Sequence, residues 1–274
     1  MTGFLDALLH EQFLQYALLG GLLASVCCGL IGSYVVVKRI SYLASGIAHT
    51  ILGGMGVAYF LGHNPMRGAL VAALGAALLI GWINLRMKEH EDTLIGALWS
   101  VGMAVGVIFV AKTPGYGIDL MSYLFGNILM ISSQDLWLMA GLDAILLALV
   151  WLFREPFLAV CFDEEFARLR GLNVTFYYLL LLCLVAITVV LLIQVVGLIL
   201  VIALLTLPAA IASQWSRSLS KIMLIATVLG SIFTLGGLAL SYEPDLPSGA
   251  TIILLAGLGY VLSLVLSKFR AASR

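Results

Sequence analysis

One histidine inside a long apolar stretch is the residue of this sequence best suited to metal chemistry. His49 stands in the run 42–61, whose other residues are apolar, small or uncharged. An ionisable side chain within a segment that crosses a membrane is energetically expensive, and such residues commonly mark a transport path or a binding site. Imidazole is also a frequent ligand of zinc and similar metals. The alternative is a histidine that hydrogen-bonds to a neighbouring helix, and the residues alone favour neither interpretation.

A carboxylate occupies a similar position in another apolar run. Asp143 lies midway along residues 136–153, shortly after Gly141. A buried carboxylate is costly unless it is paired or faces water. Asp143 could therefore bind a metal ion or hydrogen-bond within a helix bundle, and the second interpretation is slightly favoured. Cys27 and Cys28 would point about 100° apart on a helix, which makes a poor chelate, so we expect them to be small packing residues.

The largest polar island of the chain covers residues 162–173. Three acidic residues open it, at Asp163, Glu164 and Glu165, where a helix N-terminus favours negative charge. Arginines follow in the last turn, and Gly171 is typical of a helix end. The pattern predicts a short amphipathic helix outside the bilayer. Its apolar residues could face a partner protein or lipid headgroups, and they are Phe162, Phe166 and Leu169.

The overall composition is that of a protein that crosses a membrane many times. The chain is 62% hydrophobic and 10% charged, with a mean hydropathy of +1.13, whereas soluble domains are about 25% charged. The phosphate loop G-x-x-x-x-G-K-[ST] is absent, so the chain is not expected to bind ATP in that way. The hydrolase motifs H-E-x-x-H and G-x-S-x-G are absent as well, which disfavours a membrane-embedded enzyme. We expect no nucleic-acid partner.

Nine apolar runs approach the ~20 residues that a helix needs to cross ~30 Å of hydrocarbon. The region 173–214 has no charged residue and is too long for one crossing, so we expect it to double back near Gln194 and Gly197. Pro208 is expected to interrupt its second half. A version with eight crossings stays open. The nine runs are Phe13–Val37, Tyr42–Leu61, Met66–Leu85, Leu94–Ala111, Leu136–Phe153, Phe176–Leu192, Val195–Ala212, Ile222–Leu240 and Ala250–Leu266.

Basic residues predict the orientation of the chain in the membrane. If the polar island is cytoplasmic and the spans alternate, all but two of the 14 basic residues fall on the cytoplasmic side, and the exceptions are Arg67 and Lys112. The N-terminus is then outside and the C-terminus inside. On the outer side, residues 119–132 are apolar but too short to cross, which favours a re-entrant or interfacial helix.

Acidic residues gather at this predicted outer face, at Asp119, Glu243 and Asp245. They could draw cations towards the mouth of a transport path or contact a delivery protein. A solvated loop is the alternative, and for each residue alone it is favoured.

Six stretches, spread over nearly the whole chain, are informative when taken together and in order. They are VVVKRISYLASGIAHTILGG, EDTLIGALWSVGMAVGVIF, LMSYLFGNIL, FDEEFARLRGLNV, VVGLILVIALLTLPAAIA and LPSGATIILLAG. Any one of them would be weak evidence, whereas six in the order of one family are specific. In these stretches the chain resembles the integral permease subunits of bacterial ATP-driven importers for zinc, manganese and related divalent metals.

The resemblance implies partners as well as a fold. It implies a homodimeric permease in the bacterial cytoplasmic membrane, a separate ATPase, and an extracytoplasmic protein that delivers the metal. It implies a transported divalent metal ion and no permanently bound cofactor. The polar island matches the family's coupling helix, which docks in a groove of the ATPase. The residues carried over to that role are Asp163, Glu164, Glu165, Phe166, Ala167, Arg168 and Gly171.

The sequence departs from this family at one position of the expected metal site. The family usually places an aspartate four residues before the histidine, and here that position is Ser45. Positions i and i+4 are neighbours on a helix, so Ser45 and His49 could share one metal ion, with serine as a weak neutral ligand. Either the site is reduced, or another carboxylate such as Asp143 compensates, or the metal passes with little direct coordination. The candidate metal ligands are therefore Ser45, His49 and Asp143.

These observations predict an all-α fold, a polytopic transmembrane helical bundle of eight or nine spans with a short re-entrant or interfacial helix and a cytoplasmic coupling helix. Residues 1–274 are expected to form a single transmembrane permease domain. The predicted function is the membrane subunit of an ATP-driven importer of a divalent transition metal, zinc or manganese, and not an enzyme. An ion-coupled secondary transporter that works without an ATPase is the alternative.

Overall fold

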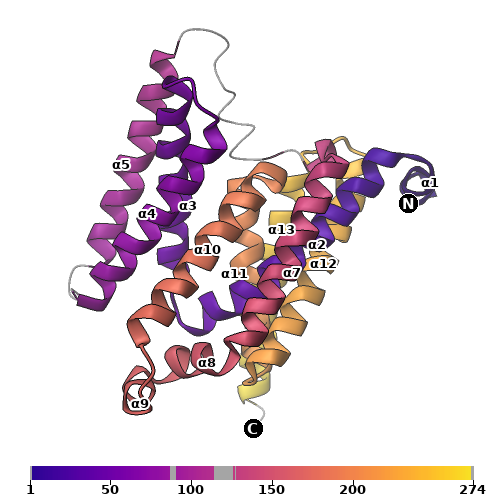
Figure 1. Cartoon of the computed structure of the whole chain (residues 1–274). Helices are drawn as coiled ribbons and strands as arrows, with labels where there is room; N and C mark the ends of the chain where they lie inside the picture. Colours follow the sequence, from indigo (N-terminus) through magenta and orange to yellow (C-terminus); the bar gives the residue numbers. More distant parts are fainter. Residues whose placement is uncertain (1, 87–90, 114–125, 127, 273–274) are drawn as a thin grey trace. The chain divides into compact units, whose positions relative to one another are not determined.

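The computed structural model describes residues 2–86, 91–113, 126 and 128–272, and every regular element within them is a helix (Figure 1). This confirms the predicted all-α fold. In chain order the helices are α1 (Thr2–His10), α2 (Gln12–Val37), α3 (Ser41–Phe60), α4 (Pro65–Arg86), α5 (Glu91–Lys112), the 3₁₀ turn η2 (Ile128–Met130), α7 (Ser133–Leu152), α8 (Arg154–Phe162), α9 (Glu164–Leu169), α10 (Val174–Val196), α11 (Leu198–Trp215), α12 (Leu219–Tyr242) and α13 (Ser248–Ala272).

Nine of the described helices are long and apolar enough to cross a membrane. They are α2, α3, α4, α5, α7, α10, α11, α12 and α13, and each overlaps one of the nine predicted runs. The count agrees with the nine-crossing prediction rather than the eight-crossing one. Hydropathy finds these helices because a helix in lipid must satisfy its own backbone groups and expose apolar side chains.

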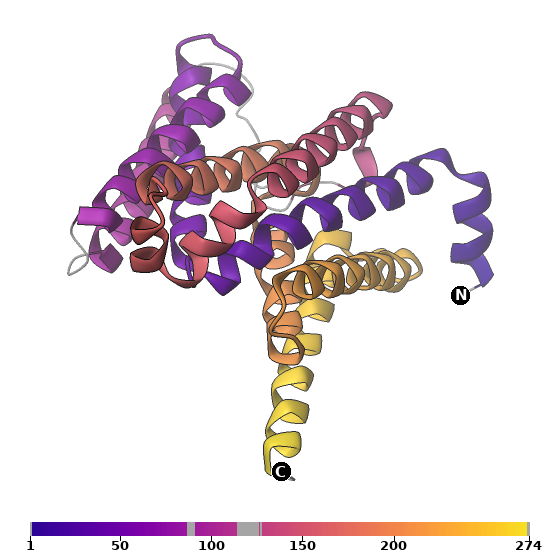
Figure 2. The ribbon, with the colours of Figure 1, turned by 60° about the horizontal axis from the view of Figure 1, so that its bottom comes forward.

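The helices fall into two compact units, each built from separate stretches of the chain. The first unit holds residues 1–37, 121–148 and 192–274, and the second holds residues 38–120 and 149–191. In the first unit, α2 packs along α11 and α12, and its neighbourhood with α12 is visible in Figure 2. Buried hydroxyl groups of Ser25 and Thr234 share a hydrogen bond of 3.4 Å between α2 and α12. The single-domain expectation stays a prediction.

In the second unit, α3 packs against both α4 and α5 through glycine residues (Figure 1). A Cβ atom built on Gly54 would lie 2.3 Å from the carbonyl oxygen of Gly68, and one built on Gly53 would lie 2.7 Å from that of Gly102. Such contacts need residues without side chains, because they bring helix backbones together. The first of these glycines, Gly53, lies one turn after His49 on α3.

Replacing Gly54 by alanine is expected to lower the free energy of unfolding by about 1–3 kcal/mol, because the new methyl group forces α3 and α4 apart. The matched control is Gly75→Ala on α4, where an added Cβ meets nothing within 4 Å. That variant should be neutral or slightly stabilising, since alanine favours a helix over glycine. Thermal unfolding of both variants in detergent measures the difference, and equal midpoints would contradict the close contact.

The structure confirms one of the two predicted breaks between residues 173 and 214. Gly197, with φ of +81°, separates α10 from α11. The prediction for Pro208 was wrong, because α11 continues through it from Leu198 to Trp215. A proline removes one backbone donor, but transmembrane helices tolerate this because neighbouring helices and local adjustments satisfy the freed carbonyl.

Two helices outside the predicted runs flank the spans, α1 at the start and α8 before the polar island. Most of the predicted re-entrant segment 119–132 lies outside the described residues. Its described end contains η2, of which Ile128 is buried, and is followed by α7.

Candidate functional site

His49 and Ser45 lie one turn apart on α3, in the second unit, and both are half-buried. The imidazole of His49 stacks on the indole of Trp99 from α5, with ring centroids 4.1 Å apart and planes 6° from parallel. Its Nδ1 atom is buried and has no hydrogen-bond partner. An imidazole has two ring nitrogens, and the unpartnered Nδ1 atom is the one that could serve a ligand. Both interpretations of His49 stay predictions.

These two side chains alone do not make a complete metal site. Among the described residues, no group of three or more histidine, cysteine, aspartate and glutamate side chains is placed to hold a metal ion. A transport path needs ligands that bind weakly enough to release the ion. A role for Ser45 and His49 in metal binding stays a prediction.

Asp143 lies on α7 in the first unit and is 5% exposed. Its Oδ1 atom accepts a hydrogen bond of 2.7 Å from the Sγ atom of Cys27 on α2. Its Oδ2 atom is buried without a partner. Of the two interpretations of Asp143, this contact agrees with a carboxylate that is hydrogen-bonded within the helix bundle. Cys27 was expected only to fill space, and it also donates this hydrogen bond. A role for Asp143 in metal binding stays a prediction.

The polar island forms α9 with the expected ends. Asp163 precedes the helix, and its Oδ1 atom accepts a hydrogen bond of 2.9 Å from the backbone N–H of Phe166. At the other end, Gly171 has φ of +77°. There the backbone N–H of Leu172 donates to the carbonyl of Ala167 at 3.0 Å, and that of Gly171 to the carbonyl of Arg168 at 2.9 Å. This double closure satisfies the last carbonyls of the helix, so local sequence defines both ends of α9.

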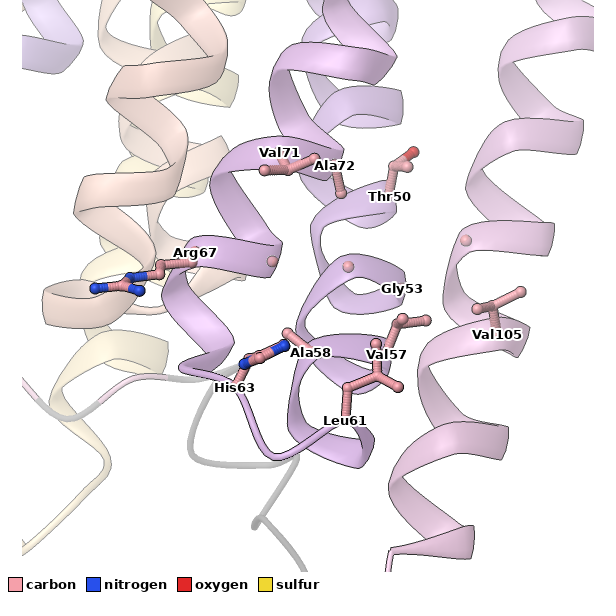
Figure 3. Close-up of a pocket in the computed structure, with 13 residues that line it drawn as sticks. Thr50, Gly53, Val57, Ala58, Leu61, His63, Arg67, Val71, Ala72 and Val105 are labelled. Carbon is pink, nitrogen blue, oxygen red and sulfur yellow. The ribbon is translucent and has the colours of Figure 1, made fainter.

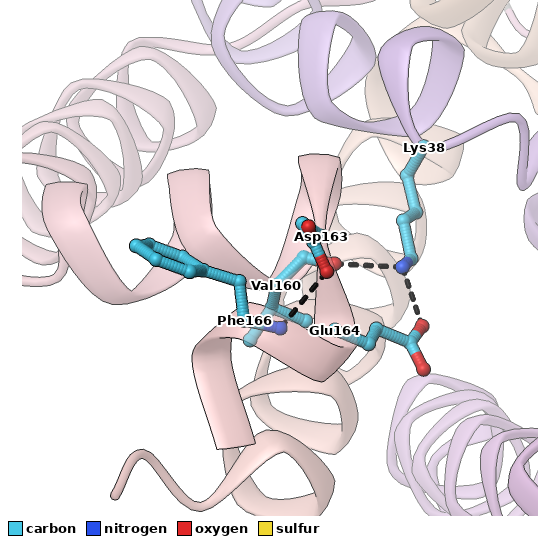
Figure 4. A network of polar contacts seen from close by, with 5 residues as sticks. All are labelled: Lys38, Val160, Asp163, Glu164 and Phe166. Atoms are coloured by element: carbon cyan, nitrogen blue, oxygen red, sulfur yellow. Dashed lines mark hydrogen bonds and ion pairs between the residues drawn. The ribbon is translucent and has the colours of Figure 1, made fainter. Parts of the chain in front are cut away.

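Lys38, in the connection between α2 and α3, ties α8 and α9 together (Figure 4). Its Nζ atom donates to the backbone carbonyl of Val160 at 2.7 Å and to Oε1 of Glu164 at 2.6 Å. The ammonium also lies 5.8 Å from the ring centre of Tyr178. The side chains of Lys38 and Glu164 are 14% and 27% exposed. A partly buried pair with a second acceptor is stronger than an exposed one, so Lys38 fixes α9 against the start of α3.

The thiol of Cys161 lies beside this pair on α8. Burial is the main cause that raises the pKa of the Cys161 thiol, while the charge of Lys38 opposes the shift and that of Glu164 adds to it, and together they bring the pKa to about 12. The thiol therefore stays protonated near neutral pH. A protonated and buried thiol is a poor nucleophile, so Cys161 belongs to the packing of α8.

Replacing Lys38 by methionine is expected to lower the free energy of unfolding by about 1–3 kcal/mol, because Glu164 and the Val160 carbonyl both lose a charged donor. The double variant Lys38→Met/Glu164→Gln should recover part of this loss, since it leaves no unpaired charge. Lys221→Met, at an exposed lysine of α12, is the control. Thermal unfolding in detergent measures all three variants. A Lys38→Met midpoint equal to that of Lys221→Met would contradict a stabilising role for the contacts of Lys38 with Val160 and Glu164.

The outer side of α9 and the adjoining end of α8 present apolar side chains. Phe162 is 61% exposed, Phe166 47% and Leu169 87%. The Arg170 guanidinium covers part of this surface, 4.7 Å from the ring centre of Phe166. A cavity of about 440 Å³ opens between α8 and α9, lined by residues such as Pro156, Phe162 and Phe166. Glu165 and Arg168 are exposed as well, whereas Ala167 is fully buried beneath the helix.

Of the three acidic residues predicted at the outer face, the structure describes two. Asp119 lies outside the described residues. Glu243 and Asp245 are both exposed, on the short connection between α12 and α13. Asp245 has φ of +51° and lines a cavity of about 340 Å³ together with Leu129 and the first turn of α13. The structure thus places these two carboxylates on one loop, while their role at a transport mouth stays a prediction.

Two residues that complete these sites were not predicted. Lys38 was counted only as a basic residue between spans, and Trp99 was not singled out. Both contacts join residues far apart in the sequence, and no local pattern signals them. One sign of the pair between Lys38 and Glu164 was available in the sequence. Lys38 directly follows a predicted span, and the acidic island that contains Glu164 was predicted on the same, cytoplasmic side of the membrane.

Comparison with known proteins places the whole chain in one group. The family model of the ABC 3 transport family matches residues 10–267. A probable metal transport system membrane protein of Chlamydia pneumoniae is 42% identical, covering 96% of this chain and 94% of its own. The manganese transport system membrane protein MntC of Halalkalibacterium halodurans is 33% identical, covering 97% and 91%. A solved structure, PsaBC from Streptococcus pneumoniae in complex with Fab, is 32% identical with a TM-score of 0.85, covering 96% of this chain and 94% of that one.

Proposed function

The chain belongs to the ABC 3 transport family, and from that premise we propose that it carries manganese across the cytoplasmic membrane, with zinc as the second candidate. It is the multi-pass membrane subunit of an ATP-driven transporter and not an enzyme, and ATP hydrolysis belongs to a separate protein. The ion-coupled secondary transporter, which was the alternative, is not supported by this family.

The choice of manganese rests on one observation, the nearly full-length similarity to a protein named for manganese transport. The donor set does not decide between the two metals. Serine and water oxygens suit hard cations such as manganese, whereas imidazole suits zinc and several other metals. A site with one imidazole, one hydroxyl and no thiolate is therefore compatible with either ion. Manganese is placed before zinc because of the similarity to the manganese transport protein.

We propose that His49 and Ser45 contact the ion as it passes. The free Nδ1 atom of His49 would supply one ligand in its unprotonated form. The indole of Trp99 holds the imidazole plane, which limits the reorganisation needed when the ion arrives. Ser45 and water would complete a weak shell, and a weak shell permits rapid release.

We further propose that the exposed side of α9 receives the separate ATPase. The apolar residues Phe162, Phe166 and Leu169 and the adjoining cavity offer an anchor site, and exposed charges such as Glu165 and Arg168 form a polar rim. The Lys38 tie connects this surface to the beginning of α3, the helix that carries Ser45 and His49. Movement of α9 would therefore reach the proposed ion contacts through one short connection. Two copies of the chain and an extracytoplasmic delivery protein near Glu243 and Asp245 complete the proposal.

The test is uptake of radioactive manganese by vesicles that contain the chain with its partner ATPase and delivery protein. Uptake is expected to require ATP and to be lowered by excess unlabelled manganese more strongly than by zinc, iron or magnesium. Stronger competition by zinc would reverse the order of the two metals. Uptake at full rate without the ATPase would contradict the ATP-driven mechanism.

A further inference from the structure

A long apolar groove runs along the second unit between α3, α4 and α5 (Figure 3). Its volume is about 610 Å³, within the ~300–1,000 Å³ typical of ligand sites. The walls are almost entirely carbon and include Val57, Leu61, Val71 and Val105. Leu61 is 60% and Val71 73% exposed, so the groove is open along one side.

The three helices that form the groove are all long and apolar enough to cross a membrane. The glycines that bring these helices together, such as Gly53, Gly54 and Gly68, also line the groove, so part of its surface is bare backbone. From Thr50 to Leu61 the wall rises ~16 Å at 1.5 Å per residue, about half of the ~30 Å hydrocarbon thickness. The groove therefore has the length of one leaflet and the composition of a site for an acyl chain.

The end of the groove nearest the membrane surface carries polar side chains. His63 lies in the connection between α3 and α4, and Arg67 lies in the first turn of α4 (Figure 3). Both side chains are exposed. Among the described residues, no carboxylate pairs with the guanidinium of Arg67. Connections between consecutive spans lie at the depth of the lipid headgroups, where an arginine can reach a phosphate.

This groove does not suit the metal cargo. An arginine at its mouth repels a divalent cation, and its carbon walls offer almost no ligands. The hydroxyl of Thr50 already donates to the carbonyl of Gly46 at 2.8 Å. Arg67 is also one of only two basic residues predicted outside the cytoplasmic face, where positive charge is disfavoured. A bound anion would account for a guanidinium at that place.

We propose that this groove binds one anionic phospholipid of the outer leaflet. One acyl chain occupies the space between α3, α4 and α5, and the phosphate accepts hydrogen bonds from Arg67 and His63. Basic pockets between transmembrane helices recognise anionic headgroups in this way. The lipid would cover the exposed surface of the close contacts between α3 and its two neighbours.

The test uses the full chain, reconstituted in nanodiscs of equal parts phosphatidylglycerol and phosphatidylcholine and then released for native mass spectrometry. Phosphatidylglycerol is expected to stay bound about fivefold more often than phosphatidylcholine, the preference that one cationic contact supplies. Arg67→Gln should abolish the preference, and Val71→Trp, which fills the groove, should remove both lipids. The matched controls are Lys112→Gln and Val107→Trp, which lie on α5 outside the groove.

Three results would overturn the proposal. One is equal retention of the two lipids by the unmodified chain. Another is a preference that persists in Arg67→Gln, a surface variant that should fold normally. The third is a Val71→Trp variant that keeps its lipid but shifts from dimer to monomer, because a second copy of the chain would then occupy the groove.

Discussion

Replacing Leu169 by aspartate is expected to lower ATP-dependent manganese uptake by at least about fivefold while the chain still inserts and folds. Leu169 is 87% exposed at the end of α9, so the substitution should change the free energy of unfolding by no more than ~0.5 kcal/mol. In the proposed complex with the ATPase, the same carboxylate would be buried without a partner. That penalty of about 1–3 kcal/mol corresponds to a loss of roughly 5- to 150-fold in binding.

The measurement pairs uptake into vesicles with co-elution of the ATPase from detergent. Leu9→Asp is the matched control, because Leu9 is likewise an apolar and largely exposed residue, 72% exposed, near the end of the short helix α1. It should leave ATPase co-elution unchanged. Normal uptake by Leu169→Asp would remove α9 from the contact with the ATPase. Glu165→Arg, which reverses an exposed charge of the same helix, tests the polar rim of the same surface.

The structure also shows why Ala167 is the wrong position for this test. Ala167 is fully buried beneath α9, so an aspartate there would disturb the helix itself as well as any contact made by it. A loss of uptake in such a variant would not distinguish the two causes. Leu169 lies two residues later on the same helix and is 87% exposed. A substitution there can distinguish a lost contact with the ATPase from damage to the helix, because its side chain contacts little of its own chain.

The features that the sequence predicted correctly are those that depend on residues close together along the chain. The nine crossings follow from hydropathy, and the ends of α9 follow from Asp163 and Gly171, because a side-chain cap and a residue with positive φ act within one turn. Pro208 was misjudged because a local rule for soluble helices does not account for the support that a helix receives inside a membrane protein.

The contacts that shape the candidate site join distant parts of the chain. Lys38 and Glu164 are 126 residues apart, and Cys27 and Asp143 are 116 apart. The stack of His49 on Trp99 joins two helices that are not consecutive. Residue types limit which of these pairs can form, but only the packing of the helices brings the partners together. The sequence could therefore nominate His49, Asp143 and Glu164 without identifying the residue that holds each one.

Replacing His49 by alanine is expected to lower manganese uptake by at least about tenfold, the scale of effect seen when the environment of a metal ligand is altered. The substitution removes the only described imidazole on α3 and its free Nδ1 atom. Uptake is measured in vesicles with the ATPase and delivery protein, at a manganese concentration below half-saturation. His10→Ala, at an exposed histidine of α1, is the bystander control and should keep full uptake.

A second variant distinguishes metal contact from packing. His49→Phe keeps an aromatic ring that can stack on Trp99 but offers no nitrogen atom to a metal. If the imidazole binds the ion, the phenylalanine and alanine variants lose uptake to a similar degree, although the phenylalanine variant should retain more of the thermal stability. If His49 serves only to pack α3 against α5, the phenylalanine variant transports normally, and the ion path must then run along other residues.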